Sequence, residues 1–524
     1  MEIANDQALK TYSGGLGFLA GSHMKSAYDL KQNLIGVTIL WTAGYYDQVR
    51  DDNQRMQVRF RNKQYAFLED AGIEVTVPIW GQDVKVKAYV LKPETFNTAP
   101  IYYLTTDLEE NPIDYRYATF RLYDVDRTKR IMQYMILGIG GIKVVEALGG
   151  ADVYHMNEAH ALPMAFYRYK KYGNLDSVRK KMVFTTHTPE KAGNDEFDYG
   201  MIEGMGYFSG VPAEEVKRIL DMPDKLGTTP AGLKMSRKAN AVSQLHGEVS
   251  RDMWKDVDNA CPIIAITNAQ NAKAWQDDTL YSLINKKDLT PFIERKKELK
   301  RALFEEVADQ TGKLFRDDVL TIVWARRFAA YKRANLILRD MDRFWRLLYN
   351  EKYPVQILWA GKPYPEDGPA VNLFNTIVEI TAGKNNCAIL TGYELRLSKL
   401  MKGGADLWLN TPRKPREASG TSGMTAAMNG AINLTIDDGW IPEFGKANKN
   451  SFIIDSAPES EPEHVRDQHA YESLMSQLEQ TIVPMYYEDK EAWYKIAKKG
   501  MKDVLPFFDS DRMADEYYER MFKG

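Results

Sequence analysis

The chain has 524 residues, a formal net charge of −3 at pH 7, and 44% hydrophobic and 27% charged residues. Its length exceeds what one hydrophobic core usually supports, so we expect two packed units. A charge so close to neutral argues against a nucleic acid as the main partner. Any chemistry with anions must therefore come from local groups of basic residues.

The cysteine content and the apolar pattern exclude several other classes of protein. Cys261 and Cys387 are too few for a disulfide framework, and no Cys or His spacing is typical of a metal site. No run approaches the roughly 18 apolar residues that span a bilayer. The first residues lack the basic and apolar regions of a signal peptide. We therefore expect a cytoplasmic protein with no metal ion and no membrane contact.

The first half of the chain contains apolar runs that predict buried strands, at 34–41, 151–155, 181–186 and 262–267. We place a domain boundary near residue 275, which gives domains 1–275 and 276–524. The charged helical stretch 291–311 follows this boundary and is predicted to connect the two units.

The second half shows a more regular alternation of strands and helices. Nearly continuous β-branched or aromatic runs predict strands covered on both faces, at 318–325, 355–361, 387–391, 405–409 and 431–436. Helical spacing between them, as at 334–350 and 369–383, predicts an α/β fold with a parallel, doubly wound sheet. Ligands bind at the carboxyl ends of such strands, so we expect a ligand-binding cleft there.

A glycine-rich loop, Ser13 to Gly17, precedes a helical pattern over 18–29. Glycines let successive backbone N–H groups converge, and a helix N-terminus adds partial positive charge, so the pair favours an anion. A simple turn before a helix explains the same pattern.

Four cations, Arg326, Arg327, Lys332 and Arg333, follow the predicted strand 318–325. Arginine offers phosphate a bidentate fork and lysine offers a point charge. The alternative is a solvated basic turn. The position at a strand end favours a phosphate site.

A loop of small residues, Glu417 to Met424, leads into another helical pattern. Its backbone amides suit an anion, and Glu417 suits sugar hydroxyls because a carboxylate accepts from two at once. A flexible linker is the alternative. Polar residues near other predicted strand ends are Asn157, Glu158, His160, His187, Asn240 and His246. A lone histidine is more often structural.

These blocks, in this order, resemble the α-glucan (glycogen, starch, maltodextrin) phosphorylase family, especially its short bacterial and archaeal branch. The matching stretches are YSGGLGFLAGSHMKSAYDL, HMNEAHA, VFTTHTPE, MSRKANAVSQLHGEVSRDMW, ITN, WARRFAAYKR, LWAGKPYP and ADLWLNTPRKPREASGTSGM. The resemblance implies a GT-B fold, with two Rossmann-like domains facing across a cleft. It also implies retaining transfer of glucose between an α-1,4-glucan end and phosphate.

The resemblance implies a role for residues in each block. Those near the cofactor phosphate would be Gly14, Gly15, Arg326, Thr421 and Ser422. Those that hold the substrate phosphate would be Arg327 and Lys332, with His187 on the acceptor side. Those near the sugar would be Leu16, Asn157, Arg237, Asn268, Glu417, Ser419 and Gly420.

The chain departs from the family pattern at three places. The family lysine that forms a Schiff base with pyridoxal phosphate corresponds to Thr425, which has no amine. Stretch 268–271 reads NAQN, where the family usually has glycine after the asparagine. The chain also begins shortly before the glycine loop, which predicts a short or truncated form.

Three functions remain open from the sequence. The first is phosphorolysis, with pyridoxal phosphate absent or held without a covalent bond. The second is a cofactor-free glucosyltransferase that uses ADP- or UDP-glucose. The third is an inactive glucan-binding homologue. The expected partners are an α-glucan or maltodextrin and phosphate, glucose 1-phosphate or a nucleotide sugar, with a homodimer possible.

Overall fold

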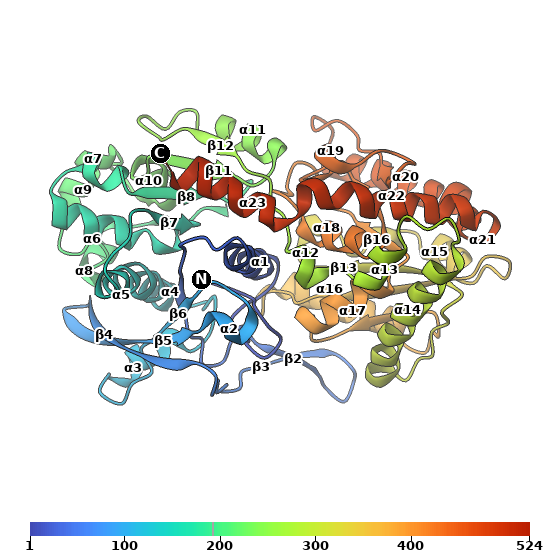
Figure 1. Cartoon of the computed structure of the whole chain (residues 1–524), viewed down its shortest axis with the longest axis horizontal. Coiled ribbons are helices and arrows are strands. Elements are labelled where there is room, and N and C mark those ends of the chain that lie inside the picture. The colour runs from blue at the N-terminus through green and yellow to red at the C-terminus, as the bar shows by residue number, and fades with distance from the viewer. Residues whose placement is uncertain (191–192, 524) are drawn as a thin grey trace. The chain divides into compact units, whose positions relative to one another are not determined.

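The computed structural model describes residues 1–190 and 193–523, and the chain divides into two compact units (Figure 1). The first unit contains Met1–Tyr46, Phe60–Asn268 and the segment from Ser510 onward; the second contains Asp47–Arg59 and Ala269–Asp509. The division at 268/269 falls shortly before the boundary predicted near 275. The sequence did not predict the assignment of 47–59 to the second unit or of the final segment to the first.

The first unit has a parallel sheet whose strand order is β12-β11-β8-β7. These strands are β7 (Tyr154–Asn157), β8 (Met182–Thr185), β11 (Lys238–Ala241) and β12 (Ile263–Ala265). β8 and β12 fall in predicted runs, β7 overlaps the end of the predicted run 151–155, and β11 was not predicted. The carboxyl ends of these strands meet at one edge of the sheet, which brings residues shortly after β7, β8 and β12 to the same edge.

A second sheet of the first unit is mixed and has the order β1-β6-β5-β4. Its strands are β1 (Gly36–Ile39), β4 (Glu69–Ile79), β5 (Gln82–Leu91) and β6 (Ile101–Thr105). β1 pairs parallel to β6, and the other neighbours are antiparallel. β4 alternates exposed and half-buried residues over most of its length, as a strand with one wet face does.

The second unit has a six-stranded, all-parallel sheet with the order β15-β14-β13-β16-β17-β18. The strands are β13 (Leu320–Ala325), β14 (Val355–Ala360), β15 (Cys387–Leu390), β16 (Leu407–Asn410), β17 (Ile432–Ile436) and β18 (Ser451–Ile454). All five predicted strands of this half are confirmed, and β18 at the sheet edge was missed. The mixed α/β class with parallel sheets is confirmed.

Helices accompany each sheet (Figure 1). The longer helices of the first unit are α1 (Gly15–Asp29), α4 (Arg127–Met135), α5 (Gly141–Ala147), α6 (Pro163–Tyr172), α8 (Tyr199–Met205), α9 (Ala213–Leu220), α10 (Thr228–Lys234), α11 (Gln244–Met253) and α23 (Ser510–Tyr517). Those of the second are α14 (Thr290–Thr311), α15 (Met341–Leu348), α16 (Gly368–Thr381), α17 (Leu395–Gly404), α18 (Thr421–Met428), α20 (Glu463–Gln477), α21 (Val483–Glu488) and α22 (Lys490–Phe508). No helix within the described residues is both long and apolar enough to cross a membrane.

Helix α14 covers the predicted stretch 291–311, but it packs within the second unit. Leu303, Phe304 and Val307 join the apolar cluster of the large sheet. The amine of Lys300 donates to the carboxylate of Asp406 at 2.5 Å, next to the start of β16. This helix is therefore part of the second unit's core.

The order of the large sheet fixes where a ligand is expected in the second unit. Strand order reverses between β13 and β16, and ligands of open parallel sheets bind beyond the carboxyl ends of strands at such a reversal. Arg326 follows β13 directly, and the loop from β16 to α18 carries Glu417. The two predicted motifs of this half thus meet at one sheet edge.

Candidate functional site

Glu417 lies between two cations from the strand-end motif. Its carboxylate accepts from Nη2 of Arg326 at 2.9 Å and from Nζ of Lys332 at 2.8 and 3.0 Å. Burial alone would raise the pKa of Glu417, but the charges of Arg326 and Lys332 lower it to about 2. The exposed Arg327 acts in the same direction. We call Arg326, Lys332 and Glu417 the Glu417 cluster.

Arg326 has capacity to bind a further acceptor. Its side chain is 7% exposed, and its Nε and Nη1 atoms are buried without a hydrogen-bond partner in the described part of the chain. The hydroxyls of Ser419 and Ser422 are likewise buried without a hydrogen-bond partner among the described residues. Native proteins satisfy nearly all buried polar groups, so each such group needs an explanation. Several donors around one loop fit an anion that carries many acceptor oxygens.

Arg333, from the same motif, has a different role. Its Nε and Nη2 donate to the carbonyl oxygens of Thr411 and Pro412, each at 2.8 Å, and its Nη1 donates to Asp467 at 2.8 Å. Arg413 also binds Asp467. The guanidinium of Arg333 therefore holds the loop after β16. Within the motif, Arg333 is a structural cation, whereas Arg326 keeps donors that a ligand could use.

The loop from Glu417 to Gly420 is fixed by a turn that follows β17. Asp438 accepts from the backbone N–H of Glu417 at 3.0 Å and of Gly439 at 2.8 Å, and the N–H of Trp440 donates to the carbonyl of Ser419. A Cβ on Gly439 would lie 2.2 Å from that oxygen, and its φ of +62° also favours glycine. Asp438 thus positions the backbone that carries Glu417.

The sequence interpretation missed Asp438, although the signal was present. The residue is a carboxylate just beyond the predicted strand 431–436, where functional side chains concentrate. Burial, followed by the charge of Glu417, raises the pKa of Asp438 to about 7. This carboxyl group therefore changes its protonation near neutral pH.

The glycine loop of the first unit is organised around an internal carboxylate. Glu2 accepts from the backbone N–H groups of Ser13 at 2.6 Å and Gly14 at 3.2 Å, and from the hydroxyl of Tyr123 at 2.8 Å. Helix α1 begins at Gly15, and a Cβ on Gly14 or Gly15 would meet nothing within 4 Å. Gly14, Gly15 and the half-buried Leu16 thus lie at the predicted helix start, and their ligand roles stay predictions.

Asn157 and His187 meet at the carboxyl edge of the parallel sheet in the first unit. Nε2 of His187 lies 2.6 Å from Oδ1 of Asn157. Burial, followed by the nearby His246 and His155, lowers the pKa of His187 to about 3. A neutral imidazole can accept or donate a hydrogen bond, but it holds no extra proton to give as an acid at pH 7. The catalytic role of His187 stays a prediction, and it excludes action as a general acid at pH 7.

Glu158 holds His187 in place through the backbone. Its carboxylate accepts from the N–H of His187 and the hydroxyl of Thr188. Glu158 has a φ of +64°, an uncommon conformation for a side chain of this size, and strained residues of this kind cluster at functional sites. Asn268, shortly after β12, is buried, and its Oδ1 has no partner within the described residues, as expected of a group that binds a ligand hydroxyl.

Arg237 lies at the opposite edge of the same sheet. It precedes β11, and its guanidinium donates to the carbonyl oxygens of Met521 at 2.9 Å and Phe522 at 2.8 Å. The structure therefore does not bring Arg237 together with Asn157 and His187. Its observed role is to hold the C-terminal segment on the first unit.

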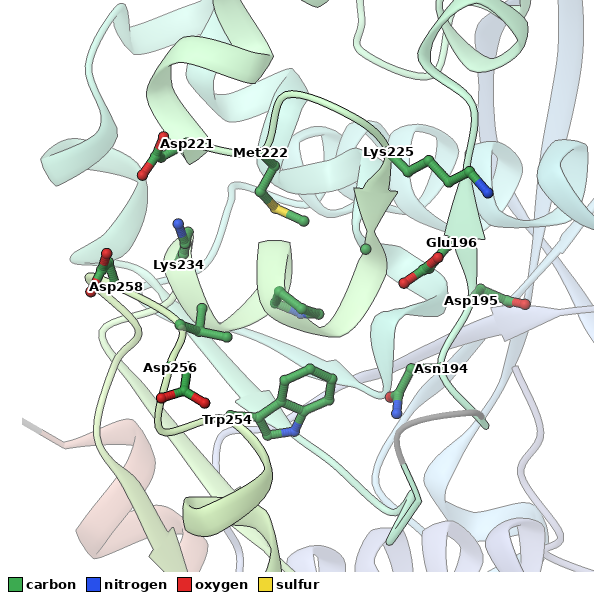
Figure 2. A pocket seen from close by; sticks show the side chains of 13 residues that line it. Asn194, Asp195, Glu196, Asp221, Met222, Lys225, Lys234, Trp254, Asp256 and Asp258 are labelled. Atoms are coloured by element: carbon green, nitrogen blue, oxygen red, sulfur yellow. The ribbon is translucent and has the colours of Figure 1, made fainter.

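The first unit also has a pocket of about 310 Å³, shown in Figure 2. Its lining includes Trp254 and Met222, the carboxylates of Asp195, Glu196, Asp221, Asp256 and Asp258, and the amines of Lys225 and Lys234. The five carboxylates outnumber the two amines, which disfavours an anion. None of the site residues predicted from the sequence lines this pocket.

The second unit is a parallel α/β unit with the Glu417 cluster at the carboxyl edge of its sheet, and comparison with known proteins identifies the family. A carbohydrate phosphorylase family model matches residues 273–481. The chain is 31% identical to maltodextrin phosphorylase of Thermococcus litoralis over 585 residues. This alignment covers 100% of this chain and 70% of that protein. The chain belongs to this family, and the resemblance stated from the sequence is confirmed.

Two further relatives are similar to this chain over nearly its whole length. Glycogen phosphorylase of Aquifex aeolicus is 30% identical over 594 residues, or 99% of this chain and 85% of that protein. An uncharacterized protein of Methanocaldococcus jannaschii is 46% identical over 525 residues, or 100% of this chain and 98% of that protein. The family therefore supports glycosyltransferase-type chemistry for this chain.

Proposed function

We propose that this protein catalyses retaining glucosyl transfer on α-1,4-glucans, and converts glucan and inorganic phosphate to glucose 1-phosphate and a shortened glucan. Membership of the phosphorylase family supports this reaction type. The GT-B arrangement, acceptor binding by the first unit and a cytoplasmic location belong to the same proposal.

One observation carries the proposal: Arg326 is buried, binds Glu417 through Nη2 only, and keeps Nε and Nη1 without a partner among the described residues. Acceptor oxygens of a bound phosphate group would suit these donors. The nearby Arg333 shows the contrasting state, because main-chain carbonyls and Asp467 occupy its donors.

Glu417, Lys332 and the adjacent Arg327 have distinct roles in this reaction. The glycosidic bond at the anomeric carbon breaks, a phosphate oxygen bonds to that carbon on the same face, and the phosphate gives its proton to the oxygen that leaves with the shortened glucan. Arg327 and Lys332 stabilise the charge on the phosphate as this happens. Because phosphate competes with Glu417 for these cations, the carboxylate is released to accept from sugar hydroxyls. The backbone N–H groups of Ser419 and Gly420 would donate to sugar oxygens.

Pyridoxal phosphate, which the family resemblance implies, fits this chain only in part. Arg326, Thr421 and Ser422 would hold its phosphate group, which when bound would supply a site for proton transfer beside the substrate phosphate. Residue 425 does not fit its covalent attachment. The hydroxyl of Thr425 is buried and donates to the carbonyl oxygens of Thr421 at 3.4 Å and Ser422 at 3.1 Å.

This misfit favours one second candidate, transfer from ADP- or UDP-glucose without a cofactor. A diphosphate would use the same donors of Arg326 and Lys332 that a phosphate uses. The two activities separate cleanly in one experiment. Purified protein is incubated with maltodextrin and phosphate, and separately with maltodextrin and either nucleotide sugar. Glucose 1-phosphate in the first reaction supports phosphorolysis. Glucan extension only in the second supports the alternative, and glucan binding with neither product indicates an inactive homologue.

Lys332→Ala tests the cluster directly. It should lower the rate of the phosphate-dependent reaction by about 10²–10³, the cost of losing one charge contact to the transition state. Lys300→Met is the matched control, because it removes a buried lysine–carboxylate pair at the amino end of the same sheet. Lys300→Met should reduce stability but leave the kcat of folded protein unchanged. An unchanged rate in Lys332→Ala would exclude Lys332 from the site.

A further inference from the structure

A hairpin that lies between two stretches of the first unit in sequence belongs to the second unit. Segment 47–59 contains β2 (Asp47–Arg50) and β3 (Met56–Arg59), which pair antiparallel. The backbone N–H of Met56 donates to Oδ1 of Asn375 in α16 at 3.0 Å. The hairpin is therefore docked on the second unit, although none of its residues belongs to the Glu417 cluster.

Gln48, in β2, joins the loops that follow two neighbouring strands of the large sheet. Its Nε2 donates to the carbonyl of Gly361, just after β14, at 3.1 Å, and its Oε1 accepts from the N–H of Gly392, after β15, at 3.0 Å. A carbonyl only accepts and an N–H only donates, so these two partners fix which way the amide points. The side chain is 6% exposed, and its Nε2 also lies 3.6 Å from Sδ of Met56. Gln48 thus forms a buried bridge between two loops at the carboxyl edge of the sheet.

Both bridged loops contact the main chain at the end of β13. The N–H of Arg326 donates to the carbonyl of Ala360 at 3.1 Å. A Cβ on Gly361 would lie 1.9 Å from the carbonyl oxygen of Arg326, so these two backbones are in close contact. From the other loop, the hydroxyl of Tyr393 donates to the carbonyl of Ala325 at 3.3 Å. The glutamine bridge therefore closes a ring of contacts around the backbone that carries Arg326.

We propose that Gln48 is a positioning residue for Arg326, so that hairpin 47–59 completes the anion site of the second unit. Charge-assisted hydrogen bonds depend on distance and angle, so Arg326 binds phosphoryl oxygens well only when its main chain is held in place. Glu417 fixes only Nη2 of that side chain, and the ring of contacts fixes the backbone from which it extends. The ligand is a phosphoryl group, either inorganic phosphate or the diphosphate of a nucleotide. The inference rests on the proposed function for the phosphate-binding role of Arg326.

A second buried glutamine of the same sheet separates positioning from stability. Gln356 is 3% exposed, its Nε2 donates to the carbonyl of Arg316 at 2.8 Å, and its Oε1 accepts from the N–H of Arg316 at 3.0 Å. Gln356 lies at the amino end of β14, whereas Gly361 follows the carboxyl end. Both glutamines thus tie main-chain groups together, but only Gln48 does so beside Arg326.

Calorimetric titration of the full chain with inorganic phosphate, and separately with ADP and UDP, tests the proposal. Gln48→Ala should weaken binding by about tenfold, the lower end of what loss of an outer partner costs at a metal site. In the phosphorolysis assay it should raise the KM for phosphate and leave the KM for maltodextrin unchanged. Gln356→Ala, the matched control, should lose stability and keep its affinity for the ligand. Equal losses of affinity in the two variants would overturn the positioning role.

Gln48→Ala is expected to fold, because Lys362 and Glu394 form a buried ion pair between the same two loops at 2.9 Å. If it does not fold, a measurement on the unaltered protein decides the question. Coupling between two sites is reciprocal, so a phosphoryl group bound by Arg326 should stabilise the glutamine bridge. The ligand that binds should therefore slow hydrogen exchange in peptides that contain Gly392. Unchanged exchange there would overturn the inference.

Failure of this inference is distinguishable from failure of the proposed function. If Gln48→Ala bound phosphate as tightly as the unaltered protein, Gln48 would have no positioning role and phosphorolysis would stand. If the unaltered protein bound ADP or UDP but not phosphate, and Gln48→Ala weakened that binding, the positioning role would stand and phosphorolysis would be wrong. Binding of none of these ligands to the unaltered protein would overturn both.

Discussion

Two carboxylates of the second unit, Glu417 and Asp467, each lie between two cations, and their side chains are 11% and 13% exposed. Asp467 binds Arg333, whose other donors are taken up by main-chain carbonyls. Glu417 binds Arg326, whose other donors are buried without partners in the described chain. Similar charge and burial therefore accompany two different states of hydrogen bonding.

The two carboxylates differ in how many hydrogen-bond donors of their arginine partners are occupied. This occupancy, rather than charge, separates a structural cation from one that suits a ligand. A buried ion pair whose remaining donors are satisfied fixes local structure. A pair whose donors remain unsatisfied carries a desolvation cost that a bound anion would remove. By this criterion Arg326 suits a ligand and Arg333 holds the loop after β16.

The largest effect is expected when each carboxylate is neutralised. Glu417→Gln should lower the free energy of unfolding by about 3–5 kcal/mol, because it leaves two buried cations without a counter-charge. Phosphate should restore part of this stability by binding the donors that Glu417 no longer pairs. Denaturant unfolding in phosphate and in chloride at equal ionic strength measures both quantities.

Asp467→Asn is the matched control for that rescue. It removes a carboxylate of similar burial from two arginines, but Arg333 keeps its carbonyl partners. Asp467→Asn should be destabilised without a specific response to phosphate. Equal rescue of both variants would mean that the Glu417 cluster has no special affinity for the anion.

The pH dependence of stability should show two opposite contributions around the Glu417 loop. The pKa of Glu417 falls from 4.5 to about 2 on folding, so its contribution is present above 4.5 and is lost as pH falls toward 2. The pKa of Asp438 rises from 3.8 to about 7, so its contribution is present below 3.8 and is lost as pH rises through 7.

Asp438→Asn should remove the decline in unfolding free energy that the unaltered protein shows between about pH 4 and 7. The groups that act on Asp438 are the N–H donors of Glu417 and Gly439 and the charges of Glu417 and Lys414. Asp437→Asn is the control, because that side chain is half-exposed and 3.6 Å from Lys414. Denaturant unfolding at several pH values gives the slopes. The same slope in unaltered protein and Asp438→Asn would contradict this assignment.

The large parallel sheet could be predicted because buried strands are continuous apolar runs. The β4–β5 hairpin was missed since a strand with one wet face alternates, and β18 since it is a short edge strand. The transfer of 47–59 and of the final segment between units depends on contacts with residues remote in sequence, which no local pattern encodes.

The candidate site shows the same limit. The sequence predicted the cluster of cations and the Glu417 loop, but it gave Arg326 and Arg333 the same chemistry. Their difference depends on Thr411, Pro412 and Asp467, which lie far along the chain from Arg333. Local motifs therefore located the site, and tertiary hydrogen bonding assigned the roles.

The smallest effect is expected for a hydroxyl near the Glu417 cluster. Ser422 lies in the first turn of α18, and its Oγ is buried without a partner within residues 1–190 and 193–523. Ser422→Ala should change the free energy of unfolding by less than about 0.5 kcal/mol, because no hydrogen bond is lost. It should weaken phosphate binding by about 1 kcal/mol, the net value of one hydrogen bond.

Ser451→Ala is the control that separates these two quantities. The hydroxyl of Ser451 is buried and donates to Oδ1 of Asn450 at 3.1 Å, so its loss should lower stability by about 1 kcal/mol and leave phosphate binding unchanged. Calorimetric titration with phosphate and denaturant unfolding measure the two effects. If Ser422→Ala bound phosphate like the unaltered protein, the Ser422 hydroxyl would be no part of the anion site, which would leave Arg326 and Ser419 as its buried unsatisfied donors.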